Sequence, residues 1–243
     1  DVDIEKLISE KYIARRALEV NPNAISSLES VDPGLESPDT THYSIVDQWG
    51  NAVSNTYTIN WNYGSGVVVE GAGFLLNNEM DDFSAKPGVP NIFGVVGNVA
   101  NEIQPEKRML SSMSPTILLK DGNVEMVLGT PGGSTIFTSV FQTIVNIMDF
   151  DMSPYEAIES TRFHHQLLPP DEITYNGFTI GNPLPKETIS QLGEKGYKAI
   201  PHDYDFGDVQ VIMREDESWI AASDPRDRGD SRIISVPKSQ ENQ

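Results

Sequence analysis

The chain has 243 residues, 38% of them hydrophobic, so it can bury a sizeable core as one large domain or two small ones. Its 17 basic and 36 acidic residues give a formal charge of −19, which would repel nucleic acid phosphates and anionic membrane surfaces. It contains no cysteine and no apolar run near the ~20 residues that span a bilayer, which argues against disulfides, zinc–thiolate sites, cysteine nucleophiles and a membrane span.

The first 39 residues differ in character from the rest of the chain. Apolar side chains recur at helical spacing and predict one amphipathic helix over residues 2–20. Residues 21–39 are rich in Pro, Ser, Asn and acids, which is typical of an exposed linker. There is no apolar core of signal-peptide type, and the abrupt start inside a helix indicates a fragment of a longer precursor.

A sheet is predicted to begin at the threonines that follow. The stretch HYSIVD, a turn over residues 48–51 and the alternating stretch AVSNTYTIN predict a β-hairpin, and further short strands are expected in residues 66–76. Residues 85–108 are too rich in Gly and Pro for a regular element, so we expect a long surface loop. Long loops in compact domains commonly act as lids or binding segments.

The remainder alternates strands and helices. A helix is expected over residues 134–150, a second from Pro154 with Ser153 as its cap, and a third over residues 186–195 that ends at Gly196. This order predicts a layered α/β plan in one domain. The strands are predicted at residues 116–120, 124–128, 172–175, 209–213 and 219–222.

Several common signatures of catalysis or metal binding are absent from the sequence. It lacks G-x-S-x-G, G-x-x-x-x-G-K-[ST] and H-E-x-x-H. The neighbours His164 and His165 would point to opposite faces of a strand, which favours structural hydrogen bonding over a shared metal. The stretch DYDFGD at residues 203–208 lacks the spacing of a full calcium loop, so we interpret it as a solvated acidic turn.

The stretch GTPGGST takes a strand through two glycines into a helix. Such a turn leaves consecutive backbone N–H groups free at a helix N-terminus, where they can hold an oxyanion. Glycines required only for a tight turn would give the same pattern, and the local sequence does not separate the two interpretations.

Two further stretches offer groups for a small zwitterionic ligand. LLNNEMDDFS clusters Glu79, Asp81 and Asp82 without basic neighbours, which suits a ligand ammonium group. LSSMSP offers the hydroxyls of Ser111 and Ser112 to a carboxylate. Ammonium plus carboxylate describes an α-amino acid, although acids and serines are also ordinary surface residues.

The doubled threonine in PDTTHYSIVD has a simple local explanation, because Thr is common at strand starts and in turns. Seven ordered blocks support another interpretation: TTHYSIVD, NTYTIN, LLNNEMDDFSAKPGVPN, LSSMSPTI, GTPGGS, RFHHQ and ASDPR. Together, from Asp39 to about Arg226, the chain resembles the small subunit of a γ-glutamyltranspeptidase. The resemblance implies the four-layer αββα sandwich of the N-terminal nucleophile hydrolases.

The resemblance also implies self-cleavage between Asp39 and Thr40. Residues 1–39 would be the C-terminal tail of the large subunit and residues 40–243 the catalytic small subunit. Thr40 would then carry a free α-amine with an intrinsic pKa near 8, which can take the proton from its own hydroxyl. One residue would supply both nucleophile and base.

The remaining site residues are assigned by the same resemblance. Thr58 would orient Thr40, and Thr41 would help position the site. Phe93 would belong to the lid of residues 87–108, at a place where relatives often carry Tyr. The backbone N–H groups of Gly132 and Gly133 would stabilise the oxyanion; Asn60, Glu79 and Asp82 would hold the α-ammonium, and Ser111 and Ser112 the α-carboxylate.

The implied enzyme is a γ-glutamyltransferase and glutathione hydrolase. Thr40 would attack the γ-glutamyl amide of glutathione or a related donor and pass the γ-glutamyl group to water, an amino acid or a dipeptide. No metal or organic cofactor is implied, and the partner is the large subunit of the same precursor in a periplasmic or secreted heterodimer. The alternatives are a glutaryl-type β-lactam acylase on the same fold, a poly-γ-glutamate depolymerase, which the lid disfavours, and an inactive binding homologue.

Overall fold

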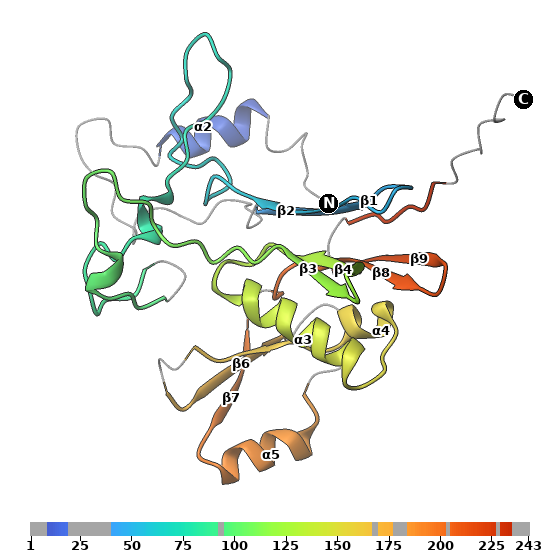
Figure 1. Cartoon of the computed structure of the whole chain (residues 1–243). Coiled ribbons are helices and arrows are strands. Elements are labelled where there is room, and N and C mark those ends of the chain that lie inside the picture. Colours follow the sequence, from blue (N-terminus) through green and yellow to red (C-terminus); the bar gives the residue numbers. More distant parts are fainter. Residues whose placement is uncertain are drawn as a thin grey trace, which may run out of the picture. The chain divides into compact units, whose positions relative to one another are not determined.

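The computed structural model of the chain (Figure 1) describes residues 9–18, 40–91, 95–166, 170–176, 184–202, 205–226 and 229–234. The chain divides into two compact units, Asp1–Pro38 and Asp39–Gln243. In the first, helix α2 (Glu10–Leu18) begins after Ser9, whose hydroxyl accepts a hydrogen bond from the Tyr12 N–H at 3.3 Å. The rest of the helix predicted over residues 2–20, and the linker at 21–39, lie outside the described residues.

The second unit starts with the predicted hairpin. Strands β1 (Thr41–Val46) and β2 (Ala52–Tyr57) pair antiparallel, with Thr41 opposite Tyr57 and Val46 opposite Ala52. The Asp47 carboxylate closes the turn, because it accepts hydrogen bonds from the N–H groups of Trp49 and Asn51 at 2.8 and 2.9 Å. This turn fixes which residues face each other along the hairpin.

A four-stranded antiparallel sheet lies against the hairpin, in the order β3-β4-β8-β9. The Ser54 hydroxyl of the hairpin donates to the Leu128 carbonyl of β4 at 3.0 Å, which joins the two sheets. The strands are β3 (Thr116–Lys120), β4 (Asn123–Gly129), β8 (Gln210–Glu215) and β9 (Ser218–Ser223).

Helices α3 (Ile136–Met148) and α4 (Pro154–Glu159) pack on the other face of this sheet, as Figure 1 shows. The helix α4 begins with a capping box between Ser153 and Glu156, so the predicted cap is confirmed. The described residues therefore contain three layers of the predicted α/β plan: the hairpin, the four-stranded sheet and the helices α3 and α4. The main core is formed by Met126, Leu128, Val140, Ile147, Ala157, Ile158, Val209, Val211 and Ala222.

A third, mixed sheet was only partly predicted. Its strands are β5 (Phe163–His164), β6 (Glu172–Asn176) and β7 (Lys198–His202), with helix α5 (Lys186–Glu194) between the last two. Strands β5 and β6 pair antiparallel, whereas β6 and β7 pair parallel. Strand β7 was missed because it contains Pro201, a residue that normally argues against a strand interior.

Two predictions are wrong. Residues 66–76 form no strand, only a single bridge between Val68 and Leu75, because Gly66, Gly71 and Gly73 adopt positive φ and interrupt the extended backbone. The described part of DYDFGD is not a solvated turn: Phe206 is 1% exposed, and residues 205–208 are packed into the protein.

The expected long loop is confirmed for its described residues. Residues 85–91 and 95–108 contain no helix or strand beyond one short 3-10 turn, η2 (Val99–Asn101). Isolated bridges join Ser84 to Glu102 and Pro90 to Val96, so the loop folds back on itself. Across the described residues, no helix has the length and apolar character needed to cross a membrane.

Candidate active site

The printed hairpin register ends one pair short of the two predicted catalytic threonines. Because Thr41 pairs with Tyr57, the antiparallel register, if it continued by one residue beyond the strands, would set Thr40 opposite Thr58. Directly opposed residues in such a pair have Cβ atoms about 4.5–5.5 Å apart. Thr40 is half-buried at this position.

The face of the hairpin that carries Thr40 continues as a buried polar strip. Side chains alternate along a strand, so Thr40, His42 and Ser44 share one face. The His42 ring makes hydrogen bonds with Thr56 Oγ1 (2.7 Å, from Nδ1) and Ser44 Oγ (3.0 Å, from Nε2), and burial lowers its pKa to about 4. The ring is therefore neutral at pH 7.

This strip runs toward residues 130–133, which we call the glycine turn because it carries Gly132 and Gly133, the glycines predicted to bind the oxyanion. Ser54 contacts the carbonyl of Leu128, and the His42 ring lies so close to Gly129 that a Cβ there would be 2.2 Å from the ring. Two residues beyond His42 and Thr56 on the same hairpin face come Thr40 and Thr58. Thr130 directly follows Gly129 at the end of β4. Continued in this way, the hairpin register and the direction of β4 would bring Thr40 toward the glycine turn.

The glycine turn has the backbone geometry that only glycine adopts readily. Gly132 and Gly133 have φ of 135° and 55°, and η3 (Gly133–Thr135) leads directly into α3. A Cβ on Gly132 would lie 2.8 Å from Thr135 Oγ1. Within the part of the chain that is described, neither glycine N–H donates to another group, so both are available to an acceptor.

A second hydrogen-bond chain links Thr58 to the acidic segment. Thr58 Oγ1 accepts from the N–H of Asn60 at 2.8 Å, and Asn60 adopts a positive φ of 78°. The Asn60 amide donates to the carbonyl of Asn78 at 3.3 Å. Glu79 follows immediately in η1 (Glu79–Asp82).

Two carboxylates of η1, those of Glu79 and Asp82, have raised pKa values. For Glu79 the cause is burial and then the charge of Asp82; for Asp82 it is burial and then the charge of Asp81. Like charges held together away from water destabilise the ionised forms. A cation bound at these carboxylates would offset both effects.

Asn101 connects the acidic segment to the serine pair. Its amide donates to the carbonyl of Asp82 at 2.7 Å, and its side-chain oxygen accepts from the N–H of Leu110 at 3.1 Å. Ser111 and Ser112 follow Leu110. Nothing in the sequence marked Asn101 for this role, because both of its partners are distant along the chain.

A cavity of about 450 Å³ lies where these segments meet, and its lining includes Asp82, Ser111 and Ser112. Ser134, directly after the glycine turn, also lines it. The lining does not include Thr40, Thr41, Thr58, Asn60, Glu79, Gly132 or Gly133. The structure thus brings the predicted carboxylate-binding serines together with one of the two predicted ammonium-binding acids.

The other predicted residues are placed as follows. Thr41 is exposed and, by strand alternation, lies on the hairpin face opposite to Thr40. Phe93 lies outside the described residues. His164 hydrogen bonds to Thr138 Oγ1 at 2.9 Å and His165 to the Pro170 carbonyl at 3.1 Å, so both rings have the structural bonds that were predicted. Among the described residues, no cluster of three or more His, Asp or Glu could hold a metal.

Comparison with known proteins decides the family. The sequence model of the family described as gamma-glutamyltranspeptidase matches residues 1–234. The chain belongs to the γ-glutamyltranspeptidase family. It is 54% identical over 233 residues to the glutathione hydrolase proenzyme of Pseudomonas aeruginosa, covering 96% of this chain and 41% of that protein. It is 43% identical over 226 residues to the glutathione hydrolase proenzyme of Escherichia coli, covering 91% of this chain and 38% of that protein.

A solved γ-glutamyltranspeptidase supports the same conclusion. The chain is similar to the γ-glutamyltranspeptidase from Pseudomonas nitroreducens complexed with L-DON, with a TM-score of 0.75 and 55% identity over 81% of this chain and 100% of that chain. The predicted fold of the N-terminal nucleophile hydrolases is thereby confirmed. The chain spans about two fifths of the length of the two proenzymes that it matches.

Proposed function

We propose that the chain forms the catalytic part of an enzyme that hydrolyses and transfers γ-glutamyl groups, with Thr40 as an N-terminal nucleophile. The observation that supports this proposal is the hairpin register, which ends at the Thr41–Tyr57 pair and, continued by one residue, would set Thr40 opposite Thr58. The names of the relatives, glutathione hydrolase proenzymes, support both the activity and a precursor that is cut.

Cleavage between Asp39 and Thr40 creates the nucleophile. The new α-amine, with a pKa near 8, accepts the proton of the Thr40 hydroxyl as Oγ1 attacks the γ-amide carbonyl. Thr58 orients Thr40, and the N–H groups of Gly132 and Gly133 stabilise the negative charge that develops on the carbonyl oxygen. The C–N bond then breaks, the leaving amine takes the proton, and a γ-glutamyl ester remains on Thr40.

Water or an acceptor amine resolves the ester. The acceptor loses a proton to the Thr40 amine as it attacks, and the proton returns to Oγ1 when the ester bond breaks. The products are free glutamate, when water attacks, or a new γ-glutamyl amide, when an amino acid or dipeptide attacks. None of these steps requires a cofactor.

The donor is recognised through its α-amino acid end. Asn60, Glu79 and Asp82 bind the α-ammonium, while Ser111 and Ser112 donate to the α-carboxylate. The raised pKa values of Glu79 and Asp82 support this assignment, because each carboxylate is partly buried and lies near another acid, and a cationic ligand would offset both effects. The family resemblance alone assigns Thr41, on the opposite hairpin face, a role in positioning the site and Phe93 a place in the lid.

The working enzyme is a heterodimer of two products of one precursor. Residues 1–39 end the large subunit, and residues 40–243 form the small subunit. A periplasmic or secreted location fits the family. The alternative of a glutaryl-type acylase is disfavoured because its substrates lack the ammonium that Glu79 and Asp82 would bind, and an inactive binding homologue would not need Thr40 opposite Thr58.

The test is intact-mass measurement of the full precursor as wild type, Thr40→Ala and Thr40→Ser. We expect wild type to split between Asp39 and Thr40, Thr40→Ala to stay whole, and Thr40→Ser to split because it keeps the hydroxyl. The split protein should release amine from γ-glutamyl-p-nitroanilide faster than from its glutaryl counterpart. A Thr40→Ala precursor that is cut at the same bond would overturn the proposal, and faster turnover of the glutaryl amide would favour the acylase.

A further inference from the structure

The segment of residues 205–209, which we call the Gly207 loop, packs directly against the glycine turn. Gly207 has φ of 74°, and a Cβ on it would be 2.2 Å from Thr130 Oγ1 and 2.5 Å from the Pro131 carbonyl oxygen. A Cβ on Gly132 would in turn lie 3.3 Å from the Cα and N of Gly207. The backbones of the two segments therefore lie in close contact.

A buried hydroxyl joins the two segments on this side. Thr130 is fully buried, and its Oγ1 accepts from the N–H of Asp208 at 2.8 Å while donating to the Pro131 carbonyl at 2.8 Å. The hydroxyl therefore uses both its donor and its acceptor capacity between the Gly207 loop and the glycine turn.

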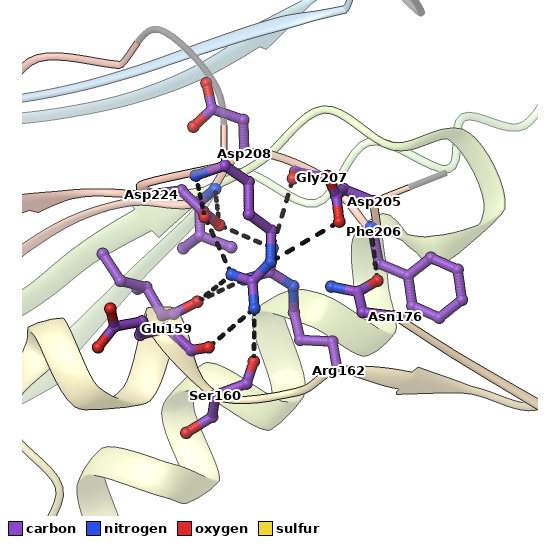
Figure 2. A network of polar contacts seen from close by, with 12 residues as sticks. Glu159, Ser160, Arg162, Asn176, Asp205, Phe206, Gly207, Asp208 and Asp224 are labelled. Carbon is purple, nitrogen blue, oxygen red and sulfur yellow. Dashed lines mark hydrogen bonds and ion pairs between the residues drawn. The ribbon is translucent and has the colours of Figure 1, made fainter. Parts of the chain in front are cut away.

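A buried ion pair also binds the loop, as Figure 2 shows. Arg162 Nη2 donates to the Gly207 carbonyl at 3.3 Å and to Asp224 Oδ2 at 2.7 Å, and both side chains are 1% exposed or less. Asp224 Oδ2 also accepts from the N–H of Val209 at 3.1 Å. The loop is thus clamped at two backbone groups.

Helix α4 anchors this ion pair. Arg162 Nη1 donates to the Ile158 carbonyl at 2.9 Å. Arg226 bonds to Asp224 Oδ1 at 3.0 Å and donates to the carbonyls of Glu159 and Ser160 at 2.8 and 3.0 Å. Guanidinium groups thereby satisfy the free carbonyls at the end of α4.

A buried ion pair is a weak source of stability, because desolvation offsets most of the attraction, and well-packed apolar residues often do as well. Its directional hydrogen bonds can, however, fix a backbone in one position. We propose that the Gly207 loop, clamped by Arg162 and Asp224, is a positioning element that sets the Gly132 and Gly133 N–H groups for the oxyanion. This inference rests on the proposed function, in which those N–H groups stabilise the tetrahedral intermediate.

The consequence is specific to the chemical step. An oxyanion donor acts at 2.7–3.1 Å, and loss of one such donor costs about 100- to 1000-fold in kcat. Partial displacement of the glycine turn should therefore lower kcat. The KM should change little, because the ammonium and carboxylate groups of the donor bind to other segments.

The test compares two substitutions of glycines with similar backbones in the full precursor. Gly207→Ala places a methyl group against Thr130 and Pro131, whereas Gly122→Ala carries the same strain at φ of 79° with nothing within 4 Å. A second pair, Thr130→Val and Thr130→Ser, removes and keeps the buried hydroxyl. Hydrolysis of γ-glutamyl-p-nitroanilide is measured per molecule cut at Asp39–Thr40, as counted by intact mass.

We expect Gly207→Ala and Thr130→Val to lower kcat by about 10- to 100-fold with KM within about twofold, while Gly122→Ala and Thr130→Ser stay near wild type. Equal kcat values within each pair, or a change in KM alone, would overturn the inference. If Gly207→Ala does not fold or is not cut, the threonine pair decides. A wild type that neither splits nor hydrolyses the substrate would count against the proposed function instead.

Discussion

The buried ring of His42 should make the stability of the protein fall in mild acid. Burial lowers its pKa from 6.5 to about 4, so the folded protein keeps the ring neutral at a pH where the unfolded chain protonates it. Below pH 6.5 the unfolded state therefore binds one more proton than the folded state. The free energy of unfolding decreases as the pH is lowered, until the folded protein also takes up this proton near pH 4. Between pH 7 and pH 5, this linkage amounts to about 2 kcal/mol.

The assay is urea unfolding of the assembled enzyme at pH 7, 6 and 5, as wild type and as His42→Gln. Glutamine can still bond to Thr56 or Ser44 but does not titrate, so the free energy of unfolding of wild type should decrease by about 2 kcal/mol more than that of the variant. Glu79 and Asp82, whose pKa values are raised, titrate in both proteins and cancel in the difference.

His165→Gln is the matched control, because it removes an imidazole but keeps His42. Parallel losses of stability in wild type and His42→Gln between pH 7 and pH 5 would refute the reasoning. They would mean that the ring takes up a proton in the folded protein as readily as in the unfolded chain.

Two further predictions concern substrate binding and helix capping. Asp82→Asn should raise the KM for γ-glutamyl-p-nitroanilide about tenfold or more at pH 7, because a charge-assisted bond to the substrate ammonium is lost. The KM for the glutaryl amide, which has no ammonium, should not rise. Equal changes in KM for both substrates would contradict ammonium binding. Ser153→Ala should lower the free energy of unfolding by about 1 kcal/mol, because its hydroxyl caps α4 at the Glu156 N–H, and an unchanged melting temperature would contradict this.

Elements with strong local signals were predictable from the sequence. The hairpin follows from period-two alternation around a turn, and α4 follows from a Ser cap before Pro154. The sequence resemblance also selected Thr40 and Thr58. Extending the hairpin register by one residue would place these two residues opposite each other, and this expectation depends on local pairing alone.

Features that depend on distant partners were not predictable. The acidic stretch containing Gly207 looked like a surface turn, but its backbone bonds to Thr130, 78 residues from Asp208, and to Arg162, 45 residues from Gly207. No local pattern reports such contacts. His42 is an intermediate case, since its place two residues after Thr40 would have put it on the same strand face.

The turn closed by Asp47 has a consequence at the far end of the hairpin. Successive side chains of a strand point to opposite faces. If the pairing slipped by one residue, Thr41 would take the place of Thr40 opposite Thr58. Both are threonines, but cleavage after Asp39 would give a free amine to Thr40 alone. The number of residues in the turn between Val46 and Ala52 therefore decides which threonine lies opposite Thr58. One more residue in this turn would replace the hydroxyl of the new chain terminus by that of an internal residue.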